Sequence, residues 1–366
     1  MNPLSSIGTL ATLTLALGAL GLPAAPGLPA TEGPQSKSKD GSVVRGMKGE
    51  ALDQAVQRVG DDFWGAVLVA RKDEILLAKG YGFADYEDTP NTPRTLFELA
   101  SASKQVAAAA ILHLEQKKKL SVSHTLECFF EDVPEDKQEI QLHHLLTHTS
   151  GISGKIGVPY ASPLVRKAYV KQMLAEPLSS APGERFEYCN VGYALLAAVV
   201  EVASKKSFEE YVEANLFKPA KMKDSGFIGD RDLVKSKRVS TRKTEEPGKW
   251  TASKWHWGWG YRGMGGVVTT VYDLWAWDRA LRAKKILKKR ALKALYEPAL
   301  EGYAYGWRIS PSPRGTRKAQ HSGSVAGYGT NVVRYLEDDA CVFVLSNDPK
   351  GAHEVSAELE RVLFGL

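Results

Sequence analysis

Short apolar runs lie near both ends of the chain, and apolar residues recur with helical spacing between them. A helical pattern at 47–59 is followed by two short runs, 64–70 and 74–79, which the charged turn at 71–73 joins. Short apolar runs on either side of a polar turn predict a β-hairpin. Further strands are expected at 305–309, 330–335 and 340–345, with a closing helix at 354–363.

The middle of the chain, roughly residues 105–290, is mainly helical and rich in loops. Helical spacing recurs there at 142–146, 165–174, 193–203 and 271–281. Strands at both ends around a helical middle predict an α/β chain of the α+β type. We expect an antiparallel sheet from both chain ends, flanked by helices, with a largely helical inserted lobe.

The N-terminal residues differ in composition from the rest. Residues 10–22 (LATLTLALGALGL) are apolar but too few to span a bilayer, and small residues follow up to Ala30. This arrangement resembles a secretory signal, although no Lys or Arg precedes Leu10. We therefore expect a signal peptide at 1–30, a linker at 31–45 and one folded domain at 46–366. Export to the periplasm or the medium follows, with a retained hydrophobic tail as the alternative.

Composition and charge are those of an ordinary globular protein. The chain has 366 residues, 43% hydrophobic and 25% charged, and a formal net charge of +6. Basic clusters at 117–119, 235–243 and 284–290 are interpreted as solvated helix ends and loops, so no nucleic-acid partner is expected. Any membrane association is expected through the N-terminal segment alone, if it is uncleaved. The oligomeric state is not readable from the sequence.

The cysteines match no metal-binding spacing and cannot all pair internally. They are Cys128, Cys189 and Cys341, and free buried thiols are the default expectation. We expect no metal and no cofactor.

Ser101-Ala102-Ser103-Lys104 stands where an extended apolar segment runs into a helical pattern. A spacing of three places the side chains of Ser101 and Lys104 on one helix face. A serine hydroxyl needs a neighbouring base near neutral pH, and a partly buried lysine at a helix N-terminus can be that base. Similar tetrads begin at Ser36 and Ser240, but neither opens an apolar helix. If no other catalytic motif accompanied this tetrad, a capped helix with a solvated lysine would explain the pattern equally well.

Tyr188-Cys189-Asn190 is a second candidate element. It follows a Pro-Gly turn and precedes a helical pattern. The Tyr188 hydroxyl could share a proton with Lys104, and the Asn190 amide could hold a substrate carbonyl or Lys104 itself. A loop tyrosine packed on the helix is the alternative.

His321-Ser322-Gly323 is the third candidate element, on an expected strand near the chain end. Gly323 would let a substrate lie against the strand edge. The amide of Ser324 could pair with the amide of Ser101 as an oxyanion hole.

Ser-x-x-Lys, Tyr-x-Asn and basic-x-Gly, in this order, resemble the penicillin-recognising serine hydrolases. These include class C β-lactamases, D-alanyl-D-alanine carboxypeptidases and related esterases. Three more segments resemble that family: 97–101 (FELAS), 145–152 (LLTHTSGI), and Gly265-Gly266 with Asp273-Leu274. Ser346-Asn347 ends a strand as in the family, so the resemblance covers about residues 50–365.

The resemblance implies a β-lactamase/transpeptidase-like fold and a serine hydrolase that forms an acyl-enzyme on an amide, lactam or ester. It implies Ser101 as nucleophile, Lys104 as the base of the first step and Tyr188 as proton relay or deacylation base. It places Asn190 on the substrate amide and 321–323 on the substrate-binding strand. The substrate would be a small molecule or a peptide.

Departures from the family pattern leave the substrate open. His321 stands where lysine is usual, and a neutral histidine would be a weaker, pH-dependent anchor for a carboxylate. Cys189 replaces the middle serine, and no glutamate-based deacylation motif is recognisable. A catalytically silent member that binds peptidoglycan, peptide or lipid is the alternative, although nucleophile, base and tyrosine are all retained.

Three other interpretations compete for parts of the chain. A zinc site at His143, His144 and His148 is disfavoured, because no acidic residue stands between His144 and His148 and no further ligand is evident. A Gly-x-Ser-x-Gly elbow is absent from the sequence, which excludes an α/β-hydrolase site. An aromatic cluster could line a cleft or pack in the core; its members are Trp250, Trp255, Trp257, Trp259 and Tyr261.

Overall fold

The computed structural model describes residues 38–366 apart from 61, 86–87, 155–161, 231, 234–235, 237, 242–257 and 326. These residues belong to one compact unit spanning 36–366. The predicted signal peptide and the first part of the predicted linker, up to residue 37, lie outside the described residues. Over the part that is described, the helices are all too short or too polar to cross a membrane.

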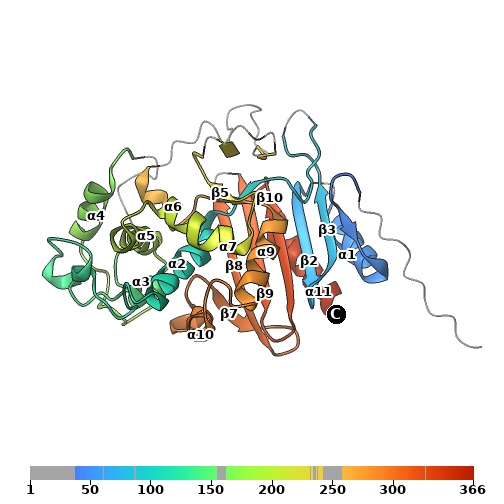
Figure 1. Ribbon diagram of the computed structural model, residues 1–366. Helices are drawn as coiled ribbons and strands as arrows, with labels where there is room; N and C mark the ends of the chain where they lie inside the picture. Colours follow the sequence, from blue (N-terminus) through green and yellow to red (C-terminus); the bar gives the residue numbers. More distant parts are fainter. Residues whose placement is uncertain are drawn as a thin grey trace, which may run out of the picture. The chain divides into compact units, whose positions relative to one another are not determined.

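A seven-stranded antiparallel sheet has the strand order β1-β3-β2-β10-β9-β8-β7 (Figure 1). Its strands are β1 (Val43–Val44), β2 (Gly65–Arg71), β3 (Glu74–Tyr81), β7 (Arg308–Pro311), β8 (Arg317–Val325), β9 (Tyr328–Tyr335) and β10 (Ala340–Ser346). Strand β2, from the N-terminal hairpin, pairs along its whole length with β10, from the C-terminal end. The prediction of a sheet built from both chain ends is confirmed.

Helices cover both faces of this sheet and form the helical lobe beside it (Figure 1). They are α1 (Gly46–Val59), α2 (Lys104–Gln116), α3 (Leu142–Leu146), α4 (Arg166–Ala175), α5 (Asn190–Ser204), α6 (Phe208–Val212), α7 (Lys218–Ala220), α9 (Val271–Arg282), α10 (Lys289–Leu295) and α11 (Ala352–Phe364). A π-helical turn, Glu213–Phe217, joins α6 to α7. The predicted helices at 47–59, 142–146, 165–174, 193–203, 271–281 and 354–363 are all present within a few residues of their expected ends.

The strands of the sheet divide their side chains between two hydrophobic cores. Successive residues of a strand point to opposite faces. Val67 and Val344 belong to the core that α1 and α11 cover, whereas Leu68 and Phe343 belong to the larger core that includes α2, α5 and α9. Burial on both faces explains why β2 and β10 are continuous apolar runs.

The extended segment before Ser101 does not join the main sheet. Its strand β4 (Phe97–Glu98) belongs to a second, three-stranded sheet, in the order β4-β6-β5 with β5 (Gly226–Phe227) and β6 (Val267–Thr269). The expectation of a single sheet was therefore incomplete. Strands of two or three residues are too short to show an alternating pattern in the sequence.

Two predicted boundaries are corrected by the structure. The C-terminal end of the expected linker is ordered, because β1 pairs with β3. The strand expected at 305–309 begins at Arg308, because Gly306 turns the chain with φ +75°. A Cβ at Gly306 would lie 2.8 Å from the backbone of Gln105, so this turn packs directly on α2.

A buried ion pair joins α9 to the sheet. Arg334 of β9 and Asp278 of α9 are 5% and 6% exposed, and their Nε and Oδ1 atoms lie 3.1 Å apart. Arg334 also donates to the Ala340 carbonyl and pairs with Asp339, while Arg282 pairs with Asp278 from one turn further along α9. Burial raises the pKa of Asp278, and the charges of Arg334 and Arg282 oppose that rise.

Replacing Arg334 with Met should destabilise the fold by about 3 kcal/mol, because the Asp278 carboxylate loses a buried partner. Urea unfolding measures the effect. The matched control is Arg317→Met on neighbouring β8, whose side chain is 55% exposed and pairs with Glu337; it should cost less than about 1 kcal/mol. Equal midpoints for the two variants would show that the buried pair contributes no more than a surface pair.

Candidate active site

Ser101 lies in a tight 3-10 turn, η1 (Ala100–Ser103), between β4 and α2. Ala100 has a left-handed backbone with φ +48°, which costs a residue with a side chain about 1–2 kcal/mol. The Thr330 hydroxyl of β9 donates to the Leu99 carbonyl at 3.0 Å. The main sheet thus holds the strained turn that presents Ser101.

Strand β8 passes directly beside this turn at Gly323. A Cβ at Gly323 would lie 2.2 Å from the Leu99 carbonyl oxygen and 3.0 Å from the Ala100 Cβ. Only glycine permits this approach without displacement of the backbone. Ser322 and Ser324, on either side of Gly323, line the same cleft as Ser101. The contact between turn and strand therefore brings together residues from opposite ends of the domain.

Lys104 is the first residue of α2 and is fully buried. Its Nζ donates to the Asn190 Oδ1 at 2.8 Å and to the Met264 carbonyl at 3.0 Å. Burial lowers the pKa of Lys104 to about 7, with a smaller opposing effect from Cys189. Once deprotonated, an amine whose two hydrogens bond these oxygens keeps a lone pair to accept a proton.

Tyr188 and Asn190 lie at the start of α5, next to Lys104. The Tyr188 side chain is 37% exposed and lines the cleft. The Lys104 Nζ lies 4.9 Å from the centre of the Tyr188 ring. Ser101 and Tyr188 thus line one cleft, whereas Lys104 and Asn190 are not among its lining residues. Asn190 contacts the buried Lys104 amine from a separate helix, and that amine lies against the Tyr188 ring.

His148 holds the segment that carries Tyr188. Its Nδ1 accepts a hydrogen bond from the Cys189 amide at 3.0 Å, and its carbonyl accepts one from the Glu187 amide at 2.8 Å. The His148 and Tyr188 rings lie 4.3 Å apart. Because Nδ1 accepts, the ring is assigned as neutral with its proton on Nε2. Burial, followed by the Lys104 and His321 charges, lowers the pKa of His148 well below its usual value.

His321 is nearly fully buried, although it is one of the residues that line the cleft beside Ser101. Its Nδ1 lies 2.7 Å from the Ser322 carbonyl, which can only accept, so Nδ1 carries the proton. Its Nε2 then accepts from the Tyr303 hydroxyl at 2.9 Å. Burial lowers the pKa of His321 to about 3, with a further contribution from the Lys104 charge. Both ring nitrogens are thus bonded within the protein, and the lowered pKa disfavours the charged form that a carboxylate anchor would need.

The cleft beside Ser101 has a volume of about 630 Å³ and contains a cation that the sequence analysis missed. Arg308 of β7 lines it, with its guanidinium 5.3 Å from the centre of the Phe186 ring and 5.6 Å from that of Tyr303. Arg308 carries no motif of its own. It reaches the site because β7 pairs with β8, with Arg308 opposite Gln320, next to His321.

A larger hollow of about 870 Å³ lies elsewhere, between the helices that include α6 and α7. None of the candidate catalytic residues lines it. We therefore place the candidate active site in the smaller cleft, which Ser101 and Tyr188 line and where the buried Lys104 amine lies behind the Tyr188 ring.

The histidines considered for zinc bond to separate partners. The Nδ1 of His143 lies 2.8 Å from the Tyr305 hydroxyl, and the Nδ1 of His144 accepts from the Gln141 amide at 3.2 Å. In the residues that the structure describes, no group of three or more His, Cys, Asp or Glu side chains is arranged to hold a metal.

Two members of the aromatic cluster pack in the core. Trp259 lies against Tyr169, with ring centres 5.6 Å apart, and buried Tyr261 donates to the Glu98 carboxylate. The other members, Trp250, Trp255 and Trp257, lie outside the described residues.

The cysteines are all free, as expected, but they differ in exposure. Cys189 and Cys341 are buried, whereas Cys128 is exposed and corrects the expectation that all three are buried.

Comparison with known proteins places this site in a family. The family described as Beta-lactamase matches residues 52–365. Penicillin-binding protein 4* of Bacillus subtilis is 29% identical over 335 residues, which cover 83% of this chain and 73% of that protein. A penicillin-binding protein structure from Bacillus halodurans superposes with a TM-score of 0.73 at 29% identity, over 85% of this chain and 98% of that one.

An octameric penicillin-binding protein homologue from Pyrococcus abyssi also has a TM-score of 0.73, at 25% identity, over 87% of this chain and 77% of that one. The resemblance inferred from the motifs is therefore confirmed, together with the β-lactamase/transpeptidase-like fold. Because the family match spans nearly the whole described domain, the chain belongs to the beta-lactamase family of serine hydrolases.

Proposed function

We propose that Ser101 is acylated by an amide, lactam or ester that carries a carboxylate, and that water then hydrolyses the acyl-enzyme. The observation that carries this proposal is the buried Lys104 amine, with a pKa of about 7, three residues from Ser101. A base with a pKa near the working pH has both a populated neutral form and the capacity to hold a proton.

In the acylation step, the Ser101 oxygen attacks the carbonyl carbon while Lys104 takes the hydroxyl proton. The backbone amides of Ser101 and Ser324 are the proposed donors to the developing oxyanion, since the contact at Gly323 holds their segments together. Collapse of the intermediate breaks the bond to the amine or alcohol, which leaves with a proton delivered through Tyr188. Asn190 keeps Lys104 in place, and its amide nitrogen is the proposed contact for the substrate amide.

Deacylation reverses the proton transfers with water as the nucleophile. Tyr188 lines the cleft and lies against the Lys104 amine, so it is placed to activate that water. When the acyl group leaves as a carboxylic acid, the proton returns to Ser101.

Arg308 is the proposed anchor for the substrate carboxylate. It is exposed in the cleft, and its cationic guanidinium lies against the Phe186 and Tyr303 rings. His321 cannot supply this charge, because its ring is neutral and bonded to Tyr303 and Ser322. The hydroxyls of Ser322 and Ser324 line the same cleft and offer additional hydrogen bonds to a carboxylate.

Acyl-enzyme trapping tests the central proposal. A fluorescent penicillin and a fluorophosphonate should each label the wild-type protein at Ser101, and intact-mass spectrometry should show one adduct. Ser101→Ala should show none, whereas Ser103→Ala, two residues further on, should still be labelled. Absence of wild-type labelling by either probe would favour the catalytically silent binding role.

Acylation should slow about tenfold for each pH unit below 7, because Lys104 must be neutral to accept the Ser101 proton and its pKa is about 7. Stopped-flow measurement of acylation by a chromogenic lactam or ester gives this fall in rate, the acidic limb of the pH–rate profile. Lys104→Ala should reduce the rate at least about a hundredfold and abolish the limb.

The control for Lys104 is Lys137→Ala. Lys137 is similarly buried, but its Nζ pairs with Asp136. It should keep the wild-type pH profile. An unchanged profile in Lys104→Ala would remove Lys104 from the base role.

Arg308→Gln should raise KM for carboxylate-bearing substrates about 10- to 100-fold, which corresponds to one lost charge-assisted interaction. A short neutral p-nitrophenyl ester should be hydrolysed at nearly the wild-type rate. Arg317→Gln, on the neighbouring strand, is the matched control. If the neutral ester is affected equally, Arg308 supports the cleft without binding a carboxylate.

A further inference from the structure

Two basic clusters that lie far apart in the sequence meet on one surface. Lys117–Lys119 follow the C-terminal end of α2, whereas the second cluster extends from the end of α9 into α10. Gln116 joins them: its Nε2 donates to the Ile286 carbonyl at 2.8 Å, and its Oε1 accepts from the Lys288 amide at 3.0 Å. Helix α10 also packs against α2 (Figure 1).

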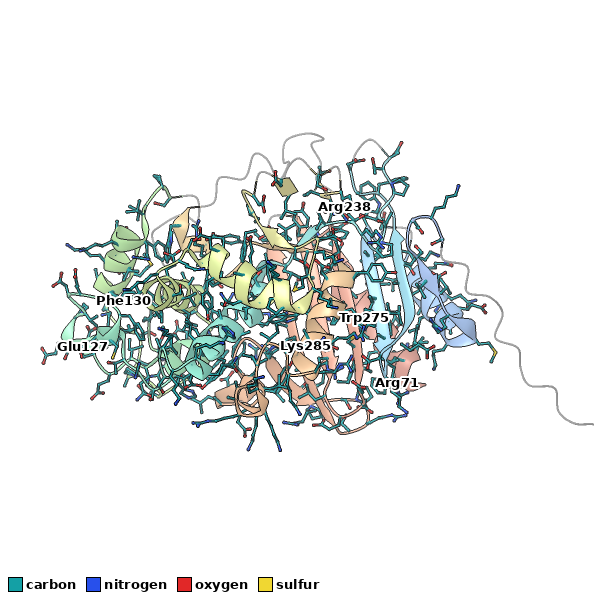
Figure 2. All side chains as sticks on the ribbon, viewed as in Figure 1. Arg71, Glu127, Phe130, Arg238, Trp275 and Lys285 are labelled. Carbon is teal, nitrogen blue, oxygen red and sulfur yellow. The ribbon has the colours of Figure 1, made fainter. Side chains whose placement is uncertain are left out.

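The resulting surface, which we call the basic patch, carries nine exposed cationic side chains. They are Lys117, Lys118, Lys119, Lys284, Lys285, Lys288, Lys289, Arg290 and Lys293. Figure 2 labels Lys285 within it. Over the described part of the chain, none of the nine forms an ion pair, although other surface cations, such as Lys167 and Arg317, do. The patch holds more positive charge than the net +6 of the whole chain.

Three of the nine charges oppose the local helix electrostatics. The other six lie at or after the C-terminal ends of α2, α9 and α10, where cations are favourable. Lys288, Lys289 and Arg290 are the N-cap and first two residues of α10, and the first turn contains no acidic residue. The N-terminal end of a helix carries partial positive charge, so cations there are unfavourable. Like charges gathered from two segments repel each other as well. A feature that opposes local stability in this way points to a role outside folding.

We propose that the basic patch docks the protein on an anionic phospholipid surface. Eight of its nine cations are lysines, which are compact point charges suited to mobile phosphate headgroups and not to the bidentate reading of a defined partner. No aromatic residue stands among 117–119 or 284–290 to stack a nucleic-acid base. The proposal is independent of the chemistry at Ser101.

Electrostatic docking has a defined strength and salt dependence. Each lysine that reaches an anionic lipid surface contributes about fivefold in affinity. The attraction falls off within a Debye length, about 10 Å at 0.1 M salt and about 3 Å at 1 M. Binding should therefore be strong at low ionic strength and absent near 1 M salt.

Sedimentation with lipid vesicles tests the proposal, using the full chain. The two vesicle types are phosphatidylcholine alone and phosphatidylcholine with about 30% phosphatidylglycerol. Binding to neutral vesicles reports the apolar segment at 10–22, and the excess binding to anionic vesicles reports the patch. The triple variant Lys288→Gln, Lys289→Gln, Arg290→Gln should lose about 100-fold of that excess affinity.

A second triple variant keeps the total charge change equal. Lys171→Gln, Lys206→Gln, Lys223→Gln removes three exposed cations from outside the patch and should retain the excess binding within about threefold. Circular dichroism verifies that both triple variants are folded. If the fluorophosphonate labels Ser101 in the wild type, it should label both triple variants equally. Equal loss in both triple variants would attribute binding to net charge and overturn the proposal. An absence of excess binding in the wild type would also overturn the proposal. The same holds if the patch binds duplex DNA but not vesicles.

Discussion

The burial of one amine, the Nζ of Lys104, is the constraint around which the active site is built. A lysine removed from water favours its neutral form, which is the form that the proposed base role requires. The two oxygens that receive its hydrogens come from Asn190 of α5 and Met264 of the turn before β6. Both segments must therefore dock on α2 before Lys104 has a defined position, so the chemistry depends on the packing of the helical lobe.

A second set of contacts determines what surrounds that base. Gly323 lets β8 close onto the turn of Ser101, and Thr330 holds the same turn from β9. His148 holds the Tyr188 segment from the opposite side, through its ring nitrogen and its carbonyl. These groups belong to the sheet and to the helical lobe respectively. The cleft is consequently assembled between rigid elements, which favours a preorganised site.

The distribution of charge explains the departure of His321 from the family's usual lysine. A histidine buried among Tyr303, Tyr188 and His148 stays neutral and acts as a hydrogen-bonding member of an aromatic cluster. The positive charge is instead displaced to Arg308, one strand further toward the sheet edge. On the proposed function, Arg308 takes over the recognition of the substrate's carboxylate from the residue at position 321.

The sequence by itself determined the family, the sheet built from both chain ends and the catalytic candidates, because those features rest on local patterns. Ser101 and Lys104 are spaced for one helical turn, and Tyr188 and Asn190 precede a helical pattern. The strands are short apolar runs. It could not reveal Arg308, the Met264 carbonyl or the second sheet, because each acquires its role only through contacts between distant segments. Nor could it show that His321 is buried against Tyr303, since the environment of a ring, and hence its pKa, is a property of packing. The basic patch belongs to the same class: its two halves are plain in the sequence, but only the hydrogen bonds of Gln116 place them on one surface.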